Sequence, residues 1–389
     1  MLSKLRWQML VMLTALFVLA LLTTSAANAT ETTKTESFKV KKGGVLEVEI
    51  DDAAADILVK TWEKAEVLVK VVGIPLEDLD ELKISESANT VRVEYYGYGG
   101  WRRSRHARIT ATVPTEFNLD LSTSGGDIEV TDKIKGKVDA ATSGGDVEVG
   151  VVEGDIQLRT SGGDVTASDV LGEATLRTSG GDIEVGNVKG VLTASTSGGD
   201  ISVGSVEKSL KASTAGGDIM IDNVGGDAVV STAGGDIEVG KVSGSASVKT
   251  AGGDIELMGA SGEVEAKTAG GDIECHGITG SIDAATAGGD IVAELMPEGR
   301  QGSSLETKGG DIELYIPGDA KVTIEARIRI RGRWYDEDEY EITSDFEAEL
   351  HEKDKKSVRA KYVINGGGPR VTLETVNGNI YIQRMGKSR

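Results

Sequence analysis

The chain has 389 residues, a formal net charge of −21 and one cysteine, Cys275, and aromatic residues make up only 4% of it. The acidic balance excludes the basic footprint of a nucleic-acid-binding protein, and a single cysteine excludes an internal disulfide framework. The scarcity of aromatic residues favours a thin interior of Ile, Val, Leu, Ala and Thr over a large globular core.

Residues 1–29 have the pattern of a secretory signal peptide. Lys4 and Arg6 form a positive start, and residues 9–22 form an apolar run that is too short to span a bilayer comfortably. Residues 27–29, Ala-Asn-Ala, supply a cleavage site of small residues. We expect an exported chain that is periplasmic, cell-surface or secreted, without an integral membrane span after cleavage. An uncleaved N-terminal anchor is the alternative.

Strand patterns follow a short polar segment. We expect residues 30–37 to be a disordered linker and residues 38–121 to form an N-terminal β cap with the first coils. Apolar and polar side chains alternate, as expected for strands, in residues 45–50, 56–59, 67–71, 90–95 and 108–113. Residues 56–59, Asp-Ile-Leu-Val, are similar to the repeat units that follow, but lack their glycines.

Residues 122–316 contain a Thr-x-Gly-Gly-Asp-[Ile/Val] unit eleven times. Its Asp recurs with a period of about 18 residues, apart from two slightly longer steps, at Asp127, Asp146, Asp164, Asp182, Asp200, Asp218, Asp236, Asp254, Asp272, Asp290 and Asp311. Each unit reads as two short alternating strands, each followed by a turn, and no stretch has the period of a helix. Such tandem strands can stack only as a parallel solenoid. At about 4.8 Å per coil, the ten steps predict a regular rod on the order of 50 Å long.

Stacking explains the corner sequence, because each corner residue lies over its copy in the next coil. We expect the two glycines to allow positive φ and to avoid collisions, and the Asp to accept hydrogen bonds from backbone amides of the turn. We expect the Thr to point inward, with its hydroxyl bonded to a turn carbonyl.

The outward positions differ between the two halves of the coil. Those of the first half are largely acidic: Glu129, Glu148, Glu184, Glu238, Glu256, Glu274 and Glu313. Those of the second half are mixed or basic and include Arg159, Arg177, Lys211, Lys249 and Lys267. Two like charges one coil apart repel by only about 1 kcal/mol in water, so the acidic row does not require a metal ion.

The regular period stops after Asp311, and we expect residues 317–389 to form a C-terminal β cap with a terminal coil. Residues 373–380 repeat the pattern of 305–312, with Asn in place of one Gly and of the Asp. A solenoid needs caps of this kind because its terminal strands otherwise leave open edges.

The Thr-[Ser/Ala]-Gly-Gly-Asp-Ile-Glu-Val units, after a signal peptide and a β-rich lead-in, resemble the bacterial putative-adhesin β-strand-repeat family, a domain of unknown function in envelope proteins. The resemblance covers residues 38–389. It implies a right-handed parallel β-solenoid outside the cytoplasm, without an established enzyme activity, cofactor or catalytic residue.

The prediction is therefore an all-β protein, a right-handed parallel β-solenoid with about 18 residues per coil and β-rich end-caps. We expect a non-catalytic, exported, adhesin-like or structural protein of the bacterial cell envelope. Two alternatives stay open: a polysaccharide-active β-helix enzyme and a calcium-binding β-roll. The first lacks the insertions that build a cleft between residues 146 and 290. In the second, one Asp per coil supplies too few of the six to eight oxygens that calcium takes. We predict no catalytic, cofactor-binding or metal-binding residue.

The densest aromatic and basic cluster lies in residues 95–106 and is the candidate binding site. Flat aromatic rings beside arginines suit sugars or anionic polymers. The candidate ligand-binding residues are Tyr96, Tyr98, Trp101, Arg102, Arg103 and Arg105. The alternative is a cap loop whose rings cover the end of the solenoid and whose arginines are solvated or pair with the acidic rod. The expected partner is a cell-envelope polysaccharide or a surface protein.

Overall fold

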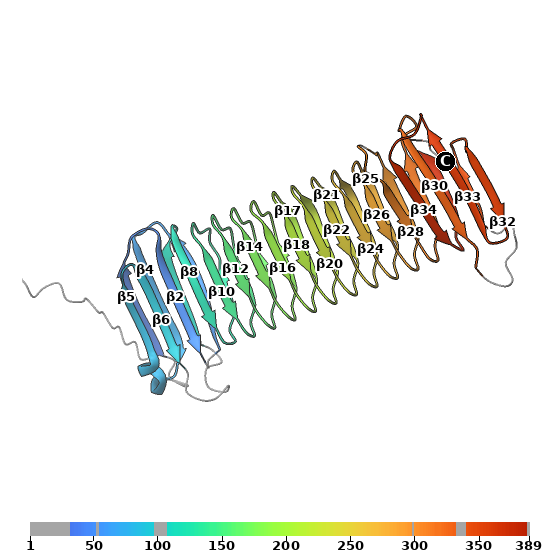
Figure 1. Cartoon of the computed structure of the whole chain (residues 1–389). Coiled ribbons are helices and arrows are strands. Elements are labelled where there is room, and N and C mark those ends of the chain that lie inside the picture. Colours follow the sequence, from blue (N-terminus) through green and yellow to red (C-terminus); the bar gives the residue numbers. More distant parts are fainter. Residues whose placement is uncertain (1–31, 52–53, 97–106, 298, 332–339, 387–389) are drawn as a thin grey trace, which may run out of the picture.

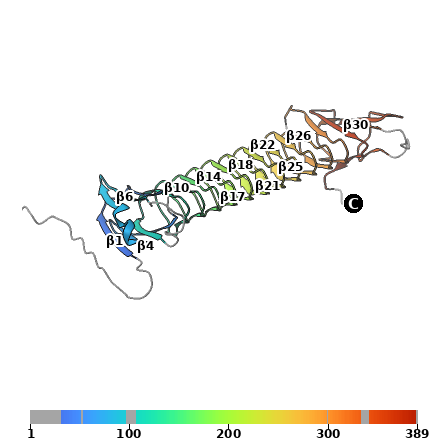
Figure 2. The same cartoon turned by 90° about the horizontal axis from the view of Figure 1, so that it is seen from below.

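Two long β-sheets build the protein. The computed structural model describes residues 32–51, 54–96, 107–297, 299–331 and 340–386, so the predicted signal peptide lies outside the described residues. The strands run side by side along a rod, from the N-terminal strands at one end to the C-terminal strands at the other (Figure 1). In the second view the even-numbered strands of the regular part follow one side of the rod and the odd-numbered strands follow the other (Figure 2). Within the described ranges, no helix has the length and apolar character needed to cross a membrane.

The first sheet carries the odd-numbered strands of the regular coils. Its strands, in spatial order, are β1 (Thr32–Lys39), β4 (Glu66–Ile74), β7 (Ala107–Pro114), β3 (Ala55–Trp62), β9 (Ile128–Val130), β11 (Val147–Val149), β13 (Val165–Ala167), β15 (Ile183–Val185), β17 (Ile201–Val206), β19 (Ile219–Val224), β21 (Ile237–Val242), β23 (Ile255–Ala260), β25 (Ile273–Ile278), β27 (Ile291–Leu295), β29 (Ile312–Ile316), β35 (Ile380–Arg384) and β31 (Ile342–Ser344).

The second sheet carries the even-numbered strands of the same coils. Its strands, in spatial order, are β5 (Leu82–Ser87), β6 (Thr90–Tyr96), β2 (Gly44–Asp51), β8 (Phe117–Thr123), β10 (Val138–Thr142), β12 (Ile156–Arg159), β14 (Ala174–Arg177), β16 (Leu192–Ser195), β18 (Leu210–Ser213), β20 (Ala228–Ser231), β22 (Ala246–Lys249), β24 (Val264–Lys267), β26 (Ile282–Ala285), β28 (Ser303–Glu306), β34 (Arg370–Val376), β30 (Val322–Arg329), β33 (Ser357–Ile364) and β32 (Leu350–Asp354). A short 3₁₀ helix, η1 (Leu76–Glu81), leads into β5.

The regular strands pair in parallel with their copies one coil away, as predicted. In β15 and β17, for example, Ile183 pairs with Ile201 and Val185 with Val203. The inward apolar side chains of both sheets pack together in one continuous buried cluster. The predicted parallel β-solenoid, with one repeat unit per regular coil and β-rich ends, is therefore confirmed, while the hand of the coil stays a prediction.

The coils at the two ends do not stack in sequence order. At the N-terminal end the coil of β2 and β3 lies directly on that of β8 and β9, and the later coil of β6 and β7 lies outside it. At the C-terminal end the last coil, β34 and β35, inserts between β28 and β29 on one side and β30 and β31 on the other. Antiparallel partners β4, β5 and β33 then cover the outer parallel strands.

One prediction for the N-terminal segment is wrong. Residues 32–37, expected to be part of a disordered linker, belong to β1, which pairs antiparallel with β4. The reason is that β4 has a free edge at the end of the sheet, and a polar segment with alternating side chains can satisfy its backbone groups. The boundaries proposed for the two cap domains stay predictions.

The corner glycines are needed for stacking and not for a positive φ. A Cβ atom on Gly199, the second glycine of its turn, would lie 2.2 Å from the carbonyl oxygen of Gly181 and 2.3 Å from Asp182 Oδ1. On Gly198, the first glycine, the nearest atom would lie 3.3 Å away. The positive-φ residues do not include the Gly-Gly pairs of the repeat corners. The predicted role in avoiding collisions is therefore confirmed, and the predicted left-handed backbone is wrong.

The corner Thr and Asp join each coil to its neighbours. Thr196 is buried, and its Oγ1 donates a hydrogen bond of 2.8 Å to the carbonyl of Gly181 in the preceding coil, as predicted. The backbone amide of Asp218 donates a hydrogen bond of 2.8 Å to Asp200 Oδ1, and the same bond recurs along the rod. The Asp acceptor therefore serves the next coil and not its own turn. Because every coil both gives and receives these bonds, the corner sequence fixes the register.

The single cysteine gives a direct test of the packed interior. Cys275 is fully buried, and burial raises the pKa of its thiol to about 12. Because the thiolate is the reactive form, we expect an aromatic disulfide reagent at pH 8 to label the folded protein only at the rate of unfolding. A Ser202→Cys variant, at an exposed position of β17, supplies a surface control that should react at once. Equal labelling rates for the two thiols would contradict the packing of β25.

Candidate functional site

The cluster predicted from the sequence is only partly placed. Tyr98, Trp101, Arg102, Arg103 and Arg105 lie outside the described residues. Tyr96 ends β6 with 36% of its surface exposed. Partial desolvation raises the pKa of the Tyr96 hydroxyl, and the negative charges of Glu49, Glu94 and Asp51 raise it further. The surroundings of Tyr96 are thus acidic, and ligand binding by this cluster stays a prediction.

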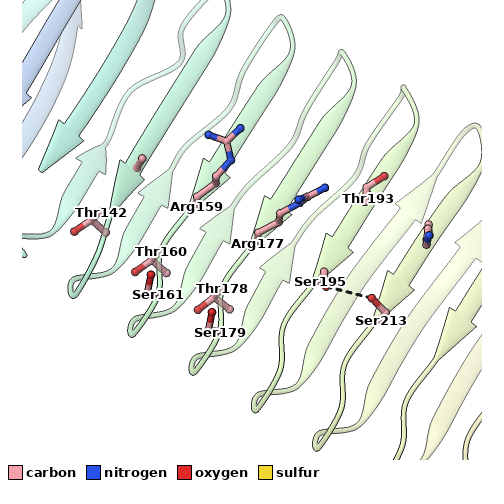
Figure 3. A pocket seen from close by; sticks show the side chains of 12 residues that line it. Thr142, Arg159, Thr160, Ser161, Arg177, Thr178, Ser179, Thr193, Ser195 and Ser213 are labelled. Carbon is pink, nitrogen blue, oxygen red and sulfur yellow. Dashed lines mark hydrogen bonds between the residues drawn. The ribbon is translucent and has the colours of Figure 1, made fainter. Parts of the chain in front are cut away.

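A shallow groove on the outer face of the second sheet is the better-defined candidate. It has a volume of about 610 Å³. Twelve residues line it: Ala141, Thr142, Arg159, Thr160, Ser161, Arg177, Thr178, Ser179, Thr193, Ser195, Lys211 and Ser213 (Figure 3). We call this surface, which spans β10 to β18, the basic groove. Its lining contains cations and hydroxyl groups but no carboxylate, imidazole or thiol.

Strand alternation places these side chains outside. In β12, Ile156 and Leu158 point into the core, so Gln157 and Arg159, which alternate with them, point outward. Parallel pairing then puts Arg159 directly beside Arg177 on β14. The same row continues through Ser195 on β16 to Ser213 on β18, whose hydroxyls share a hydrogen bond of 3.2 Å. Figure 3 shows the Arg159 and Arg177 side chains on neighbouring strands, with their guanidinium groups turned in different directions.

The positive charges of the groove have little compensation. A guanidinium nitrogen of Arg159 lies 3.9 Å from Asp139 Oδ1, at the edge of ion-pair distance. Among the described ion pairs, none involves Arg177 or Lys211. Like charges directly opposite each other on neighbouring strands are destabilising. The basic groove therefore holds cations on neighbouring strands that the described acids neutralise only in part, since Arg159 has one long contact and Arg177 and Lys211 are in none of the described ion pairs.

The protein belongs to a known family. The sequence matches the family described as Toastrack DUF4097 over residues 23–225 and 207–383. The chain is a member of the Toastrack DUF4097 family. No curated protein matches it.

The Toastrack chain is similar to three solved structures, two putative adhesins and one putative cell adhesion protein. A putative adhesin from Bacteroides fragilis shares 13% identity, with a TM-score of 0.25 and coverage of 91% of this chain and 97% of that chain. A putative adhesin from Parabacteroides distasonis shares 12% identity, with a TM-score of 0.28 and coverage of 74% and 98%. A putative cell adhesion protein from Clostridium sporogenes shares 8% identity, with a TM-score of 0.18 and coverage of 91% and 100%.

A second pair of stacked cations on the same Toastrack sheet is built differently. Lys249 on β22 pairs with Lys267 on β24, and Glu265 lies 2.7 Å from the first ammonium and 2.8 Å from the second. The Ser247 hydroxyl donates a hydrogen bond of 3.1 Å to the same carboxylate. The hydrogen bonds from Lys249 and Lys267 lower the pKa of Glu265 to about 2. Asp283 Oδ2 lies 2.9 Å from the Lys267 ammonium, so two carboxylates neutralise this pair of lysines within the fold.

The Glu265 bridge predicts a small pH-dependent stability. Its pKa is lowered in the folded state, so the bridge stabilises the protein above pH 4.5 and the effect is lost as the pH falls towards 2. Because the lysines are exposed, we expect Glu265→Gln to lower the free energy of unfolding at pH 7 by no more than about 1 kcal/mol. Urea unfolding at pH 7, 5 and 3 would show whether the free energies of unfolding of the natural chain and of Glu265→Gln approach each other as the pH falls. The variant Glu238→Gln controls for the lost charge, and a deficit that persists at low pH would contradict the assignment.

The lining of the basic groove offers binding chemistry and not acid–base chemistry. Hydrolysis of a glycoside needs two carboxylates that flank the scissile bond, and the lining of the basic groove has none. Within the described ranges, no cluster of three or more His, Cys, Asp and Glu side chains could hold a metal ion. Guanidinium, ammonium and hydroxyl groups suit a ligand that carries both acid and hydroxyl groups.

The sequence contained a partial signal for this groove. Its basic residues were recognised as outward positions of the second half-coil, but they were not grouped into a site. Arg159 and Arg177 lie one coil apart and share a row only because the pairing keeps register. Lys211 lies on the next outward row, which runs from Thr175 through Thr193. Asp139, Thr175 and Glu265 occupy the same position of the repeat. Aligning the repeats by that position shows that no coil between Asp139 and Glu265 has an acidic residue there.

Proposed function

We propose that this Toastrack protein is a non-catalytic, exported, adhesin-like rod of the bacterial cell envelope, which binds partners along an open face. The observation that carries the proposal is the uniform stacking of the coils. From β11 to β25 each strand pairs with its copy in register, without an inserted loop. Ligand contacts must therefore come from rows of outward side chains.

The corner chemistry supports a structural role for the Asp row rather than calcium binding. Asp Oδ1 already accepts the amide of the next coil, as Asp164 does from Asp182 at 2.8 Å. One remaining carboxylate oxygen per coil falls far short of the six to eight oxygens of a calcium site. Polysaccharide cleavage gains no support either, because the carboxylates at the corners are engaged by the backbone.

Export is tested by fractionating the native host. We expect the full chain in envelope or external fractions, because residues 1–29 have the pattern of a signal peptide. The variant Leu13→Arg/Leu16→Arg interrupts the apolar run and should retain the protein in the cytoplasm. The variant Leu13→Ile/Leu16→Ile keeps the run apolar and should behave as the natural chain. A natural chain found only in the cytoplasm would overturn the proposal.

Binding and catalysis are separated by one assay on envelope material. Purified protein is mixed with envelope polysaccharide, and both sedimented protein and newly formed reducing ends are measured. The proposal predicts co-sedimentation without an increase in reducing ends over a buffer control. Release of reducing ends in proportion to protein and time would favour the enzyme, and absence of co-sedimentation would remove the support for adhesion to polysaccharide.

A further inference from the structure

We propose that the basic groove binds an anionic polysaccharide, with Arg159 and Arg177 holding its acid groups and the surrounding Ser and Thr hydroxyls contacting its sugar hydroxyls. The inference rests on the proposed adhesin-like function and adds the ligand class and the residues that recognise it. The first argument is the direct pairing of Arg159 with Arg177 on neighbouring strands, which places two like charges one coil apart in the free protein. An acid group between them would offset these charges through charge-assisted hydrogen bonds.

The second argument is the contrast with the neutralised lysines. Glu265 holds Lys249 of the preceding coil and Lys267 of its own strand. In β14 the position that corresponds to Glu265 is Thr175, two residues before Arg177. The same fold could therefore have placed a carboxylate between Arg159 and Arg177, but the residue there is a half-buried threonine. The groove is thus left open for an acid from outside the chain.

Acids on the same coils do not fill this gap. The carboxylates nearest in sequence stand at the corners, where Asp155 Oδ1 accepts the amide of Glu173 at 2.8 Å and Asp164 Oδ1 accepts that of Asp182 at 2.8 Å. Asp139 contacts Arg159 only at 3.9 Å and also accepts a hydrogen bond of 3.2 Å from the Gln157 side chain. The Asp139, Asp155 and Asp164 carboxylates are therefore engaged elsewhere or lie at the margin of the groove, and the exposed Glu173, four residues before Arg177, is in none of the described ion pairs.

The spacing of the cations fits a chain molecule that lies along the rod. Arg159 and Arg177 are one coil apart, about 4.8 Å, and Lys211 lies two coils beyond Arg177, which is roughly 10 Å. Arg binds a carboxylate, sulfate or phosphate group in a planar, bidentate manner. Between the cations the groove presents Thr193 and Ser195. An acidic sugar residue at each end of the groove, with neutral hydroxyls between, matches this order.

A nucleic acid fits the groove less well. Single-stranded nucleic acids rely on aromatic rings for base stacking, and the twelve lining residues include none. A hydroxyl-rich acidic polymer without bases is the ligand that this combination of three cations and many hydroxyls favours.

The decisive variant is Thr175→Glu, which copies the Glu265 bridge into the groove. We measure retention of the full, exported chain on immobilised polygalacturonate in low salt, with neutral dextran as the control matrix. The natural chain should bind polygalacturonate and not dextran, and Thr175→Glu should bind at least tenfold more weakly. Its Tm should stay equal or rise, because the new carboxylate can contact both guanidinium groups and offsets one of their two positive charges. A loss of binding with a preserved Tm cannot be attributed to misfolding.

A pair of double variants controls for net charge. Arg159→Gln/Arg177→Gln and Lys249→Gln/Lys267→Gln each remove two positive charges from stacked positions on the same sheet, but only the first pair should reduce retention. Equal losses in both, unchanged retention of Thr175→Glu, or tighter binding to single-stranded DNA than to polygalacturonate would each overturn the inference. If Thr175→Glu still co-sediments with envelope material as the natural chain does, the groove assignment fails while the adhesin-like function stands.

Discussion

Replacing Gly199 with Ala is expected to lower the free energy of unfolding by about 2–3 kcal/mol, the upper part of the usual range for overpacking. The new Cβ atom would lie 2.2 Å from the carbonyl oxygen of Gly181 and 2.3 Å from Asp182 Oδ1. Because the carbonyl belongs to the stacked backbone of the preceding coil, it cannot move without opening the corner. Urea unfolding followed by circular dichroism would measure the loss. Hydrogen exchange would show whether the loss of stability is confined to these coils. We expect this because each repeat of a solenoid contacts only its neighbours.

The matched control is the adjacent glycine. In Gly198→Ala the nearest atom to the new Cβ lies 3.3 Å away, a distance that a slight shift can relieve. We expect a change below about 1 kcal/mol, partly offset by the lower entropy of Ala in the unfolded chain. If the two variants were equally stable, the corner glycines would be serving something other than close stacking.

Replacing Thr196 with Val is expected to cost about 1–3 kcal/mol, the penalty for leaving buried polar groups without partners. Val keeps the shape of the side chain but removes the donor to the Gly181 carbonyl at 2.8 Å and the acceptor for the Gly199 amide at 3.4 Å. Only 5% of Thr196 is exposed, so water has little access to the freed groups. Thermal and urea unfolding would measure the effect.

The control for Thr196 lies on the same strand segment but faces outward. Thr193→Val changes a hydroxyl in the basic groove, which water can reach, and should stay within about 0.5 kcal/mol of the natural chain. A Thr196→Val variant as stable as Thr193→Val would mean that the inward hydroxyls do not join the coils.

The regular solenoid could be predicted from the sequence because the repeat repeats its own contacts. Once Ile183 and Val185 face inward, their copies one repeat unit away must do so as well. The inward Thr followed from its parity with Leu192 and Ala194 on the preceding strand. The backbone amide that donates to each Asp was expected in the same turn, but it belongs to the next coil, because the stacking of the coils brings that amide close to the carboxylate.

The ends could not be predicted to the same depth, because their order in space departs from their order in sequence. Residues 56–59 and 373–380 were recognised as coils similar to the repeats, but not as the layers that lie directly on the rod. Strand β1 was missed because its side chains are mostly polar and its pairing depends on the free edge of β4. Glycine permits both a positive φ and the close approach of another backbone, and the sequence alone does not show which of the two a corner uses. The structure shows that the corner glycines serve close approach only.

The basic groove shows a further limit of reading residues one at a time. The outward direction of Arg159, Arg177 and Lys211 followed from strand alternation. The lack of a bridging acid between Arg159 and Arg177 depends on one position, Thr175, whose counterpart Glu265 bridges Lys249 and Lys267. That comparison requires the pairing register of the whole sheet, which only the structure supplies.

The central claim, that the coils stack in parallel and in register, is tested most directly by spin-label distances along one outward row of the first sheet. In a Cys275→Val background, pairs of labelled cysteines would replace Glu184 and Glu256, Glu184 and Glu274, or Glu148 and Glu274, which the pairing separates by four, five and seven coils. The structure predicts backbone separations of about 19, 24 and 34 Å, a linear rise at about 4.8 Å per coil. Distances that fail to rise with the number of coils would contradict it.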